Sequence, residues 1–348
     1  MFEPPPALKE PSQAAEAAGL IYVSEETAGI TRSGKPGRFR YRDASGKPVR
    51  DAKTLARIRA LVIPPAWQRV WIAPSADAHI QATGRDAKGR KQYRYHPDFI
   101  AIRDSTKYAH LLEFASVLPA LRKRLKADLR HRGLTREKVM ATIVTLLEGT
   151  LIRVGNEDYA RANASFGLTT LRNRHVRVKG QALHFQFKGK SGKLWDLSVH
   201  DSRVARVVAS CQELPGQHLF GYRDEEGVVR AVSSTDVNAY LREVTGRDIT
   251  AKDFRTWAGT VMAAVGFAAT DAAPTRKAVR AVIAAVAAEL GNTVAVCRRC
   301  YIHPAVIAAF EAGRPALKMP RRGREGLSSQ ELAVLSLLRR CLARPSVR

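Results

Sequence analysis

The feature that most constrains the fold is a change in hydrophobic period near residue 100. Before it, short strand-like runs such as "RFRYRD", "RVWIAP" and "HIQAT" are separated by turns rich in Gly, Pro and Asp. Beyond it, apolar residues recur mostly at helical spacing. We therefore expect an α+β protein with a loosely ordered lead over residues 1–20, a β-rich domain over residues 21–100 and a mostly α-helical domain over residues 101–348.

Three helices of the second part are predicted by local signals. "TREKVMATIVTLLEGTLIRVG" repeats apolar residues at i, i+3 and i+4, which predicts a helix ending at Arg153. Thr250 and Asp253 form a capping-box pattern before "FRTWAGTVMAAVGFAA". Gly291 follows "TRKAVRAVIAAVAAEL", as glycine often follows the end of a helix.

A β-hairpin interrupts these predicted helices. The runs "LHFQF" and "LWDLSV" both alternate in hydrophobicity, and the turn "KGKSGK" lies between them. The tip of the predicted hairpin carries Lys188, Lys190 and Lys193. A further amphipathic helix is predicted after it, from Ser329 to about Leu342.

The charge balance points to a polyanionic partner. The chain has 58 Lys and Arg against 32 Asp and Glu, a formal net charge of +26. The basic residues are interleaved with apolar ones along the whole chain, so the charge belongs to a folded surface. An excess of this size attracts polyanions before any specific contact forms, and nucleic acid is the first partner to consider.

Membrane and metal signals are weak. No run of 18 or more apolar residues occurs and the first residues do not resemble a signal peptide, so we expect a cytoplasmic, nucleoid-associated protein. The four cysteines, Cys211, Cys297, Cys300 and Cys341, are too few for a disulfide framework. The Cys-x-x-Cys pair lacks partners at zinc-ligand spacing, so we interpret it as packing and expect no metal ion and no other cofactor.

One basic ribbon in the first part allows two interpretations. In "AHIQATGRDAKGRKQYRYHP", two strand-like runs flank a polar turn. A two-stranded ribbon of this kind fits a DNA major groove. It could equally be a solvated edge hairpin whose tyrosines pack on their own sheet. The candidate DNA-binding residues are Arg85, Lys88, Arg90, Lys91, Gln92, Tyr93 and Tyr95.

Several kinds of phosphate chemistry lack their motifs. No G-x-x-x-x-G-K-[ST] loop indicates ATP hydrolysis, and no HExxH occurs. No cluster of carboxylates is present to hold two divalent ions. Phosphoryl chemistry in this chain would therefore use protein cations.

Cleavage of a phosphodiester without metal needs a hydroxyl nucleophile, cations around the phosphorane, an acid for the leaving oxygen and rigid placement. Tyr301 follows two arginines, and neighbouring guanidinium groups would favour its phenolate. Arg153, Lys190 and Arg255 are further candidates. Each of these cations alone is more often a surface charge, so spacing by itself defines no site.

Five stretches together resemble the type IB DNA topoisomerases, and most closely their poxvirus-like bacterial members. They are "GRKQYRYHP", "IRVGN" with "FGLTTLRNRHV", "FKGKSGK", "TAKDFRTWAG" and "LGNTVAVCRRCYIHP". They occur in the order found in the family, over about residues 60 to 310. The resemblance implies a mostly helical catalytic domain of the type that is also found in tyrosine recombinases, with a catalytic lysine on a β-hairpin.

The resemblance implies catalytic roles for six residues: Tyr301, Arg153, Lys190, Arg255, Asn292 and Lys252. Tyr301 would attack the phosphate and remain linked to the DNA 3′ end. Arg153 and Arg255 would stabilise the transition state. Lys190 and Lys252 would help to protonate the leaving 5′ oxygen.

Asn292 departs from the family pattern. In the viral and nuclear members that this chain resembles, a histidine lies nine residues before the tyrosine. This chain has Asn292 at that position. An amide can donate a hydrogen bond to a non-bridging phosphate oxygen, but it carries no charge and does not titrate near neutral pH. We therefore expect Asn292 to take the place of that histidine as a hydrogen-bond donor, with a cleavage rate that depends less on pH.

The implied activity is relaxation of positive and negative supercoils without ATP or metal, by a monomer that closes as a clamp around duplex DNA. Two alternatives remain open from the residues. A tyrosine recombinase would use a similar constellation, although recombinases usually show H-x-x-R where this chain has Lys252-x-x-Arg255. A non-catalytic basic DNA-binding protein would explain the charge alone.

Overall fold

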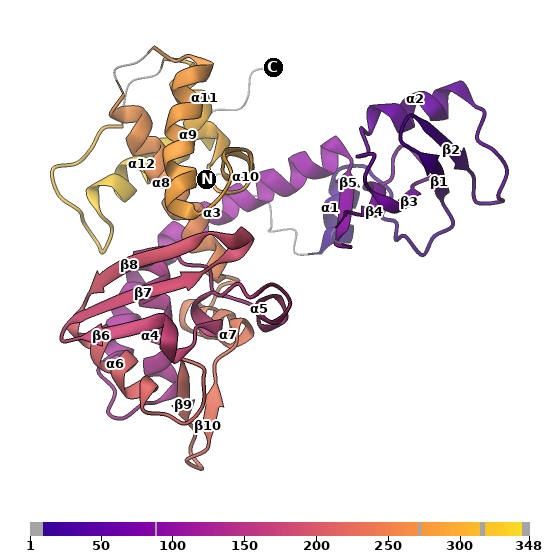
Figure 1. Cartoon of the computed structure of the whole chain (residues 1–348). Coiled ribbons are helices and arrows are strands. Elements are labelled where there is room, and N and C mark those ends of the chain that lie inside the picture. The colour runs from indigo at the N-terminus through magenta and orange to yellow at the C-terminus, as the bar shows by residue number, and fades with distance from the viewer. Residues whose placement is uncertain (1–9, 88, 271–272, 314–316, 343–348) are drawn as a thin grey trace. The chain divides into compact units, whose positions relative to one another are not determined.

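A computed structural model describes residues 10–87, 89–270, 273–313 and 317–342. The chain forms two compact units, Met1–His110 and Leu111–Arg348, and mixes helices with sheets as predicted (Figure 1). Helix α3 (Pro97–Asp128) runs from the first unit into the second and spans the domain boundary that we predicted at residue 100.

The first unit is built on an antiparallel sheet with strand order β2-β1-β3-β4-β5 (Figure 1). Its small apolar core consists of Ile30, Ile58, Val70, Ile72 and Ala82. The elements are α1 (Pro11–Ala17), β1 (Ile30–Lys35), β2 (Arg38–Arg42), α2 (Ala52–Ala60), β3 (Gln68–Ile72), β4 (Ile80–Arg85) and β5 (Lys91–Tyr95).

Helix α1 occupies part of the loosely ordered lead that we expected over residues 1–20, of which residues 1–9 lie outside the described ranges. It begins with a proline, whose fixed φ suits the first helical position. Ala14 and Ala15 are buried and cluster with Phe99. Two alanines carry little hydrophobic signal, so a helix held by their close packing on a distant aromatic ring was not predictable from periodicity.

The second unit contains one large core and most of the helices. Its elements after α3 are α4 (Arg136–Thr150), α5 (Glu157–Asn163), β6 (Val176–Lys179), β7 (Ala182–Lys188), β8 (Leu194–His200), α6 (Ser202–Gln212), β9 (Gly221–Arg223), β10 (Val229–Ala231), α7 (Ser234–Thr245), α8 (Ala251–Ala268), α9 (Arg276–Leu290), α10 (Val294–Cys300), α11 (Pro304–Glu311) and α12 (Ser329–Leu342), with short 3₁₀ turns at Leu168–Thr170, Asn173–His175 and Lys190–Gly192.

Two groups of elements pack around that core (Figure 1). Helix α6 covers the antiparallel sheet β6-β7-β8, whose strands β7 and β8 are the predicted hairpin. Helix α8 contacts α9, α11 and α12. The predicted capping box of Thr250 and Asp253 is present at the start of α8, and Gly291 ends α9 in the left-handed conformation with φ of 61°.

Helix α4 ends three residues earlier than predicted. We expected it to continue to Arg153, but it ends at Thr150 because Leu151 adopts a left-handed conformation with φ of 57°. The carbonyl of Leu151 accepts a hydrogen bond from Arg255, which is far away in the sequence. Arg153 consequently lies in a loop.

Among the described residues, no single helix is long and apolar enough to cross a membrane. Only α9 and α10 taken together meet that criterion by length and composition, and the two are bent by 91° at the break between them.

Candidate active site

A cavity of about 380 Å³ in the second unit brings together five of the six predicted catalytic residues. Its walls include Tyr301, Arg153, Lys190, Arg255 and Lys252. The lining holds these four basic side chains and no Asp or Glu. Such a cavity favours an anion.

Tyr301 is held at the end of α10 by close contact with α8. Its backbone N–H donates to the Cys297 carbonyl (3.0 Å). A Cβ on Gly259 would lie 2.6 Å from the Tyr301 carbonyl oxygen, so only glycine allows the two backbones to approach this closely. The Thr260 hydroxyl lies 3.4 Å from the same carbonyl oxygen and accepts from the backbone N–H of His303 (3.1 Å).

Arg255 places a buried guanidinium next to the Tyr301 ring. It is 3% exposed, and the central carbon of its guanidinium lies 5.3 Å from the ring centroid. It donates to the carbonyls of Leu151 and, at 2.6 Å, Leu290. These carbonyls lie at the C-terminal ends of α4 and α9, where helix dipoles favour a cation. Its Nε is buried without a hydrogen-bond partner in the described part of the chain.

Arg153 joins Asn292 to this cluster. It donates to the Gly291 carbonyl (3.2 Å) and to Oδ1 of Asn292. The Asn292 amide nitrogen is buried and has no partner among the residues that the structure describes. A buried amide donor without a partner is costly. Asn292 is the one predicted catalytic residue that does not line the cavity, and Arg153 connects it to the residues that do.

The positive charges of Arg153 and Arg255 repel each other. Burial is the main cause that lowers the pKa of Arg255 to about 10, and repulsion from Arg153 adds to it while Tyr301 opposes it. Burial also lowers the pKa of Arg153, again opposed by Tyr301. Both groups stay protonated at neutral pH. A bound anion would relieve their repulsion.

Lys190 lies in the turn between β7 and β8, and its ammonium nitrogen is 5.8 Å from the Tyr159 ring centroid. Two contacts fix this turn. A Cβ on Gly189 would lie 2.6 Å from Nε1 of Trp195, and Lys193 donates to the Ala288 carbonyl in α9. The hairpin tip is therefore attached to the helix that ends beside Asn292.

The "FGLTT" stretch supports the loop that carries Arg153. A Cβ on Gly167 would lie 2.5 Å from the Arg153 carbonyl oxygen, so the two loops need glycine there. The N–H of Leu168 donates to that carbonyl (2.9 Å) and the N–H of Thr169 to Val154 (2.7 Å). These contacts place the loop beside the cavity.

The sequence analysis missed several cavity residues: Asn156, Tyr159, Ser165 and Phe166. Asn156 and Phe166 belong to the stretches "IRVGN" and "FGLTT", and Tyr159 and Ser165 lie between them, so membership of these stretches or adjacency to them was the available signal. No periodicity marks them, because they lie in and around a short helix and loops.

The basic ribbon β4-β5 places its candidate residues on two faces. Strand alternation puts Lys91, Tyr93 and Tyr95 on one face and Gln92 on the other. Tyr93 is 41% exposed. Tyr95 stacks on Phe99 with ring centroids 5.4 Å apart and is partly buried. Tyr93 thus fits the groove interpretation, and Tyr95 fits the packing interpretation.

Most charged residues of this ribbon have intramolecular contacts. Arg85 donates to the Gly89 carbonyl (2.9 Å), Arg90 pairs with Asp86 (2.7 Å) and Lys91 pairs with Glu25 (2.5 Å). Gln92 also donates to Asp86 (3.0 Å). Lys88 lies outside the described residues. DNA would have to compete with these contacts.

The two neighbouring cysteines differ in their surroundings. Cys297 is buried, which raises the pKa of its thiol to about 11, and Cys300 is half-buried. Within the described ranges, no group of three or more His, Cys, Asp or Glu side chains could hold a metal ion.

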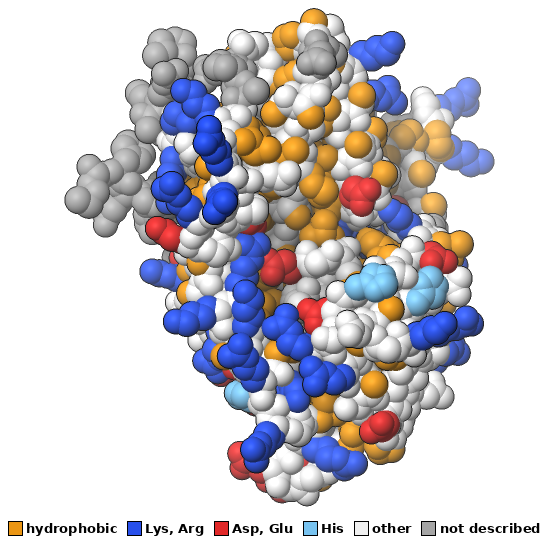
Figure 2. All heavy atoms as spheres, turned by 90° about the vertical axis from the view of Figure 1, so that its left-hand side faces the viewer, with side chains coloured by type: hydrophobic (Ala, Val, Ile, Leu, Met, Phe, Trp, Pro, Cys, Tyr) orange, Lys and Arg blue, Asp and Glu red, His pale blue; other side chains and the backbone are white. Residues whose placement is uncertain are grey.

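The surface agrees with the high net charge. On the face drawn in Figure 2, Lys and Arg side chains gather in a band that runs down the molecule, and Asp and Glu are sparse. Positive potential of this kind attracts a polyanion and speeds its association.

Comparison with known families gives two matches that cover most of the chain. The profile of the family described as "Eukaryotic DNA topoisomerase I, catalytic core" matches residues 96–319. The profile described as "Bacterial DNA topoisomerase IB, N-terminal domain" matches residues 38–86.

Individual relatives carry corresponding names. The chain is 32% identical over 285 residues to DNA topoisomerase 1B of Acanthamoeba polyphaga mimivirus, covering 79% of this chain and 85% of the relative. It is 23% identical over 236 residues to DNA topoisomerase 1 of Rabbit fibroma virus (strain Kasza), covering 64% and 70%. With DNA topoisomerase 1 of Mycosarcoma maydis it shares 24% identity over 197 residues, which is 49% of this chain and 19% of the relative.

Proposed function

The chain belongs to the type IB DNA topoisomerases, and from that premise we propose that Tyr301 is the nucleophile that cleaves one DNA strand. The observation that carries this assignment is the guanidinium of Arg255 beside the Tyr301 ring, in a cavity without carboxylates. A phenolate forming there meets positive charge already in place, and no carboxylate in the lining opposes it.

The proposed reaction exchanges one phosphodiester for another. The Tyr301 oxygen attacks phosphorus and loses its proton, and the bond to the 5′ oxygen breaks. The strand keeps a 3′-phosphotyrosine and a free 5′-hydroxyl. The reverse attack by that hydroxyl restores the DNA and the phenol. Because the covalent intermediate conserves the energy of the phosphodiester bond, the cycle consumes no ATP. In this proposal the cationic side chains of the cavity supply the charge that a metal ion would otherwise provide.

Three groups support the transition state in this proposal. Arg153 and Arg255 donate to the non-bridging oxygens, for which a planar guanidinium is well suited. The Asn292 amide nitrogen, buried and without a partner in the described structure, donates a further hydrogen bond. The two guanidinium groups are held by backbone carbonyls, so little reorganisation of these groups is needed.

Two lysines are proposed to supply the proton for the 5′ oxygen. Lys190 lies on the hairpin turn and Lys252 in the first turn of α8, and both line the cavity with Tyr301. An ammonium group that donates its proton as the P–O bond breaks gives general acid catalysis.

The N-terminal unit is proposed to bind the duplex through the ribbon β4-β5, in which Tyr93 is the more exposed of the two tyrosines. We infer that one monomer surrounds duplex DNA, prefers supercoiled DNA and relaxes supercoils of both signs by strand rotation. A nucleoid-associated location in the cytoplasm is consistent with the charge of +26. Binding through phosphates makes affinity fall steeply with salt.

The test is relaxation of negatively and positively supercoiled plasmid in EDTA without ATP. Wild-type protein should relax both and form a covalent adduct at the DNA 3′ end, whereas Tyr301→Phe should do neither. The matched control is Tyr222→Phe, which removes a phenol from β9 in the same unit and should keep activity. Relaxation by Tyr301→Phe would overturn the assignment, as would an adduct at the 5′ end.

A further inference from the structure

Helix α12 lies beyond the residues matched by the topoisomerase I profile, yet it buries an acidic side chain in the second unit. Glu331 is 6% exposed. Its backbone N–H donates to Oγ of Ser328 (3.2 Å), and its carboxylate accepts from the Ser328 N–H (2.8 Å), which together form a capping box. A capping box is complete with these two bonds and does not require burial.

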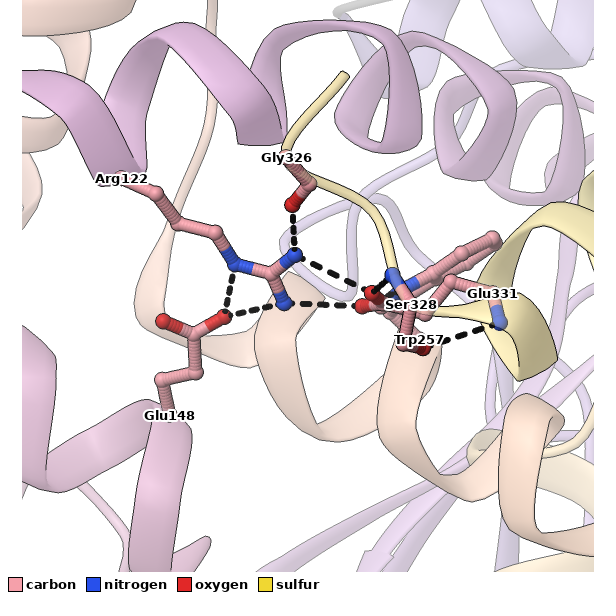
Figure 3. A network of polar contacts seen from close by, with 6 residues as sticks. All are labelled: Arg122, Glu148, Trp257, Gly326, Ser328 and Glu331. Atoms are coloured by element: carbon pink, nitrogen blue, oxygen red, sulfur yellow. Dashed lines mark hydrogen bonds and ion pairs between the residues drawn. The ribbon is translucent and has the colours of Figure 1, made fainter. Parts of the chain in front are cut away.

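The Glu331 carboxylate connects α12 with two other helices (Figure 3). Its Oε1 accepts from Nε1 of Trp257 in α8 (3.0 Å), and both oxygens accept from Arg122 in α3 (2.8 and 3.0 Å). Arg122 also donates to Glu148 in α4 (2.8 Å) and to the Gly326 carbonyl (2.5 Å). We call this set the Glu331 network: Arg122, Glu148, Trp257, Gly326, Ser328 and Glu331.

The network connects the two helices that lead to the proposed catalytic arginines. Glu148 is in the last turn of α4, just before the loop that carries Arg153. Trp257 follows Arg255 by two residues in α8. Because successive residues of an α-helix are rotated by about 100°, the side chains of Arg255 and Trp257 point to nearly opposite sides of α8.

A second cavity, of about 320 Å³, lies on the Trp257 side of α8. Its walls include Glu331, Glu148 and Leu151. The carbonyl of Leu151 accepts from Arg255, which faces the first cavity. Every member of the Glu331 network except Gly326 lines this cavity, together with apolar residues such as Phe114 and Met262.

We propose that Glu331 is a positioning residue for DNA cleavage: through Arg122 and Trp257 it holds the end of α4 and the start of α8 at the separation that lets Arg153 and Arg255 reach one phosphate. This inference rests on the proposed roles of the two arginines. Catalysis by oriented cations is sensitive to displacements of about 1 Å. Glu331 itself does not contact DNA in this account.

Two substitutions separate positioning from helix capping. Trp257→Phe removes the indole N–H and with it the bond from α12 to α8. It keeps an aromatic ring but also reduces packing, because Trp257 is part of the core, and the loss of packing is monitored by thermal unfolding. Glu331→Gln keeps the capping box, because glutamine is accepted at that position, but removes the charge that pairs with Arg122. Tyr240→Phe is the control for stability, since it removes a buried bond to Asp128 (2.6 Å) without touching either arginine.

The experiment measures single-turnover cleavage of a suicide duplex, DNA affinity and thermal unfolding for all variants. Trp257→Phe and Glu331→Gln should each slow cleavage roughly tenfold at unchanged DNA affinity. The double variant should be about as slow as the slower single variant. The reason is that each change interrupts the same series of contacts, which runs from Arg122 through Glu331 to Trp257. Tyr240→Phe should lower the unfolding temperature and cleave at the wild-type rate.

The outcomes separate this inference from the proposed function. Wild-type rates for Trp257→Phe and Glu331→Gln would overturn the positioning role and leave the role of Tyr301 intact. Equal slowing by Tyr240→Phe would show that the rate follows stability, which also overturns it. Absence of a covalent adduct in the wild-type protein would overturn both proposals.

Discussion

Arginines that donate to backbone carbonyls occur in both units of the molecule, and the two units use them differently. In the first unit, Arg32 donates to the Trp67 carbonyl (2.6 Å) and Arg57 to the Ala73 carbonyl (2.6 Å), and each has further carbonyl partners nearby. Burial lowers the pKa of both, and no neighbouring cation contributes. These arginines satisfy loop carbonyls and complete a unit with a small core.

In the second unit, Arg153 and Arg255 also donate to carbonyls, but they lie close enough to repel each other. Donor groups on Arg255, which lines the cavity, and on Asn292, which accepts from Arg153, remain without partners among the described residues. An arginine bonded to a backbone carbonyl is therefore not by itself a sign of function. The candidate site differs from the first unit in having two arginines that repel each other and hydrogen-bond donors that have no partner among the described residues.

The largest expected effect tests this distinction directly. Arg255→Ala should slow single-turnover cleavage by about 1,000-fold, the lower range for loss of an arginine that stabilises a phosphoryl transition state. Arg57→Ala should leave the cleavage rate of folded protein unchanged and lower the free energy of unfolding by about 1–3 kcal/mol. The measurements are quench-flow cleavage and urea unfolding. A similar loss of rate in Arg57→Ala would remove the contrast between the two units.

A smaller effect is expected at Asn292. Asn292→Ala should slow cleavage about 100-fold, as for loss of one oxyanion donor, whereas Asn173→Ala, which also changes a buried amide in this unit, should not. Asn292→His should keep a donor and add a pH dependence near neutrality, which wild type lacks at this position. Rate profiles between about pH 5.5 and 8 check this. Equal rates for Asn292→Ala and wild type would exclude the amide from the reaction.

The smallest effect concerns histidines, where the two units should behave alike. Burial lowers the pKa of His79 in the first unit and of His175 in the second. Each Nδ1 accepts a backbone N–H, from Val23 (3.2 Å) and Arg172 (3.1 Å). The neutral forms are thus favoured, so their stabilisation is complete above the unfolded pKa of about 6.5 and is lost as pH falls through the folded pKa.

Unfolding free energies measured from pH 7.5 downward should therefore decrease below about pH 6.5, with a slope of at most about 1.4 kcal/mol per pH unit for each histidine. His79→Gln and His175→Gln should each flatten the curve. A curve unchanged by either substitution would contradict the linkage.

Local elements were predictable where the signal was local. The alternation on both sides of "KGKSGK" predicted β7 and β8, and Thr250 with Asp253 predicted the start of α8. The early end of α4 was not predictable, because it coincides with a hydrogen bond from Arg255 to Leu151 across 104 residues. Hydrophobic periodicity predicts which face of a helix is buried, but it contains no information on which distant residues form hydrogen bonds with each other.

The site was predictable only through family resemblance, and the comparisons confirm that resemblance. Spacing alone left Arg153, Lys190 and Arg255 as ordinary surface charges. Tyr159 and Phe166 line the cavity without any periodic signal. Glu331 was predicted only as part of an amphipathic helix, because its partners Arg122 and Trp257 come from distant segments.

The place of Glu331 in the chain has a consequence for synthesis on the ribosome. Translation proceeds from the N-terminus, so Arg153, Arg255 and Tyr301 all leave the exit tunnel before Ser328 and Glu331 do. A nascent chain can therefore hold every residue proposed for cleavage while Arg122 and Trp257 still lack their carboxylate partner. In the account given above, full cleavage activity appears only after α12 has been made and has docked.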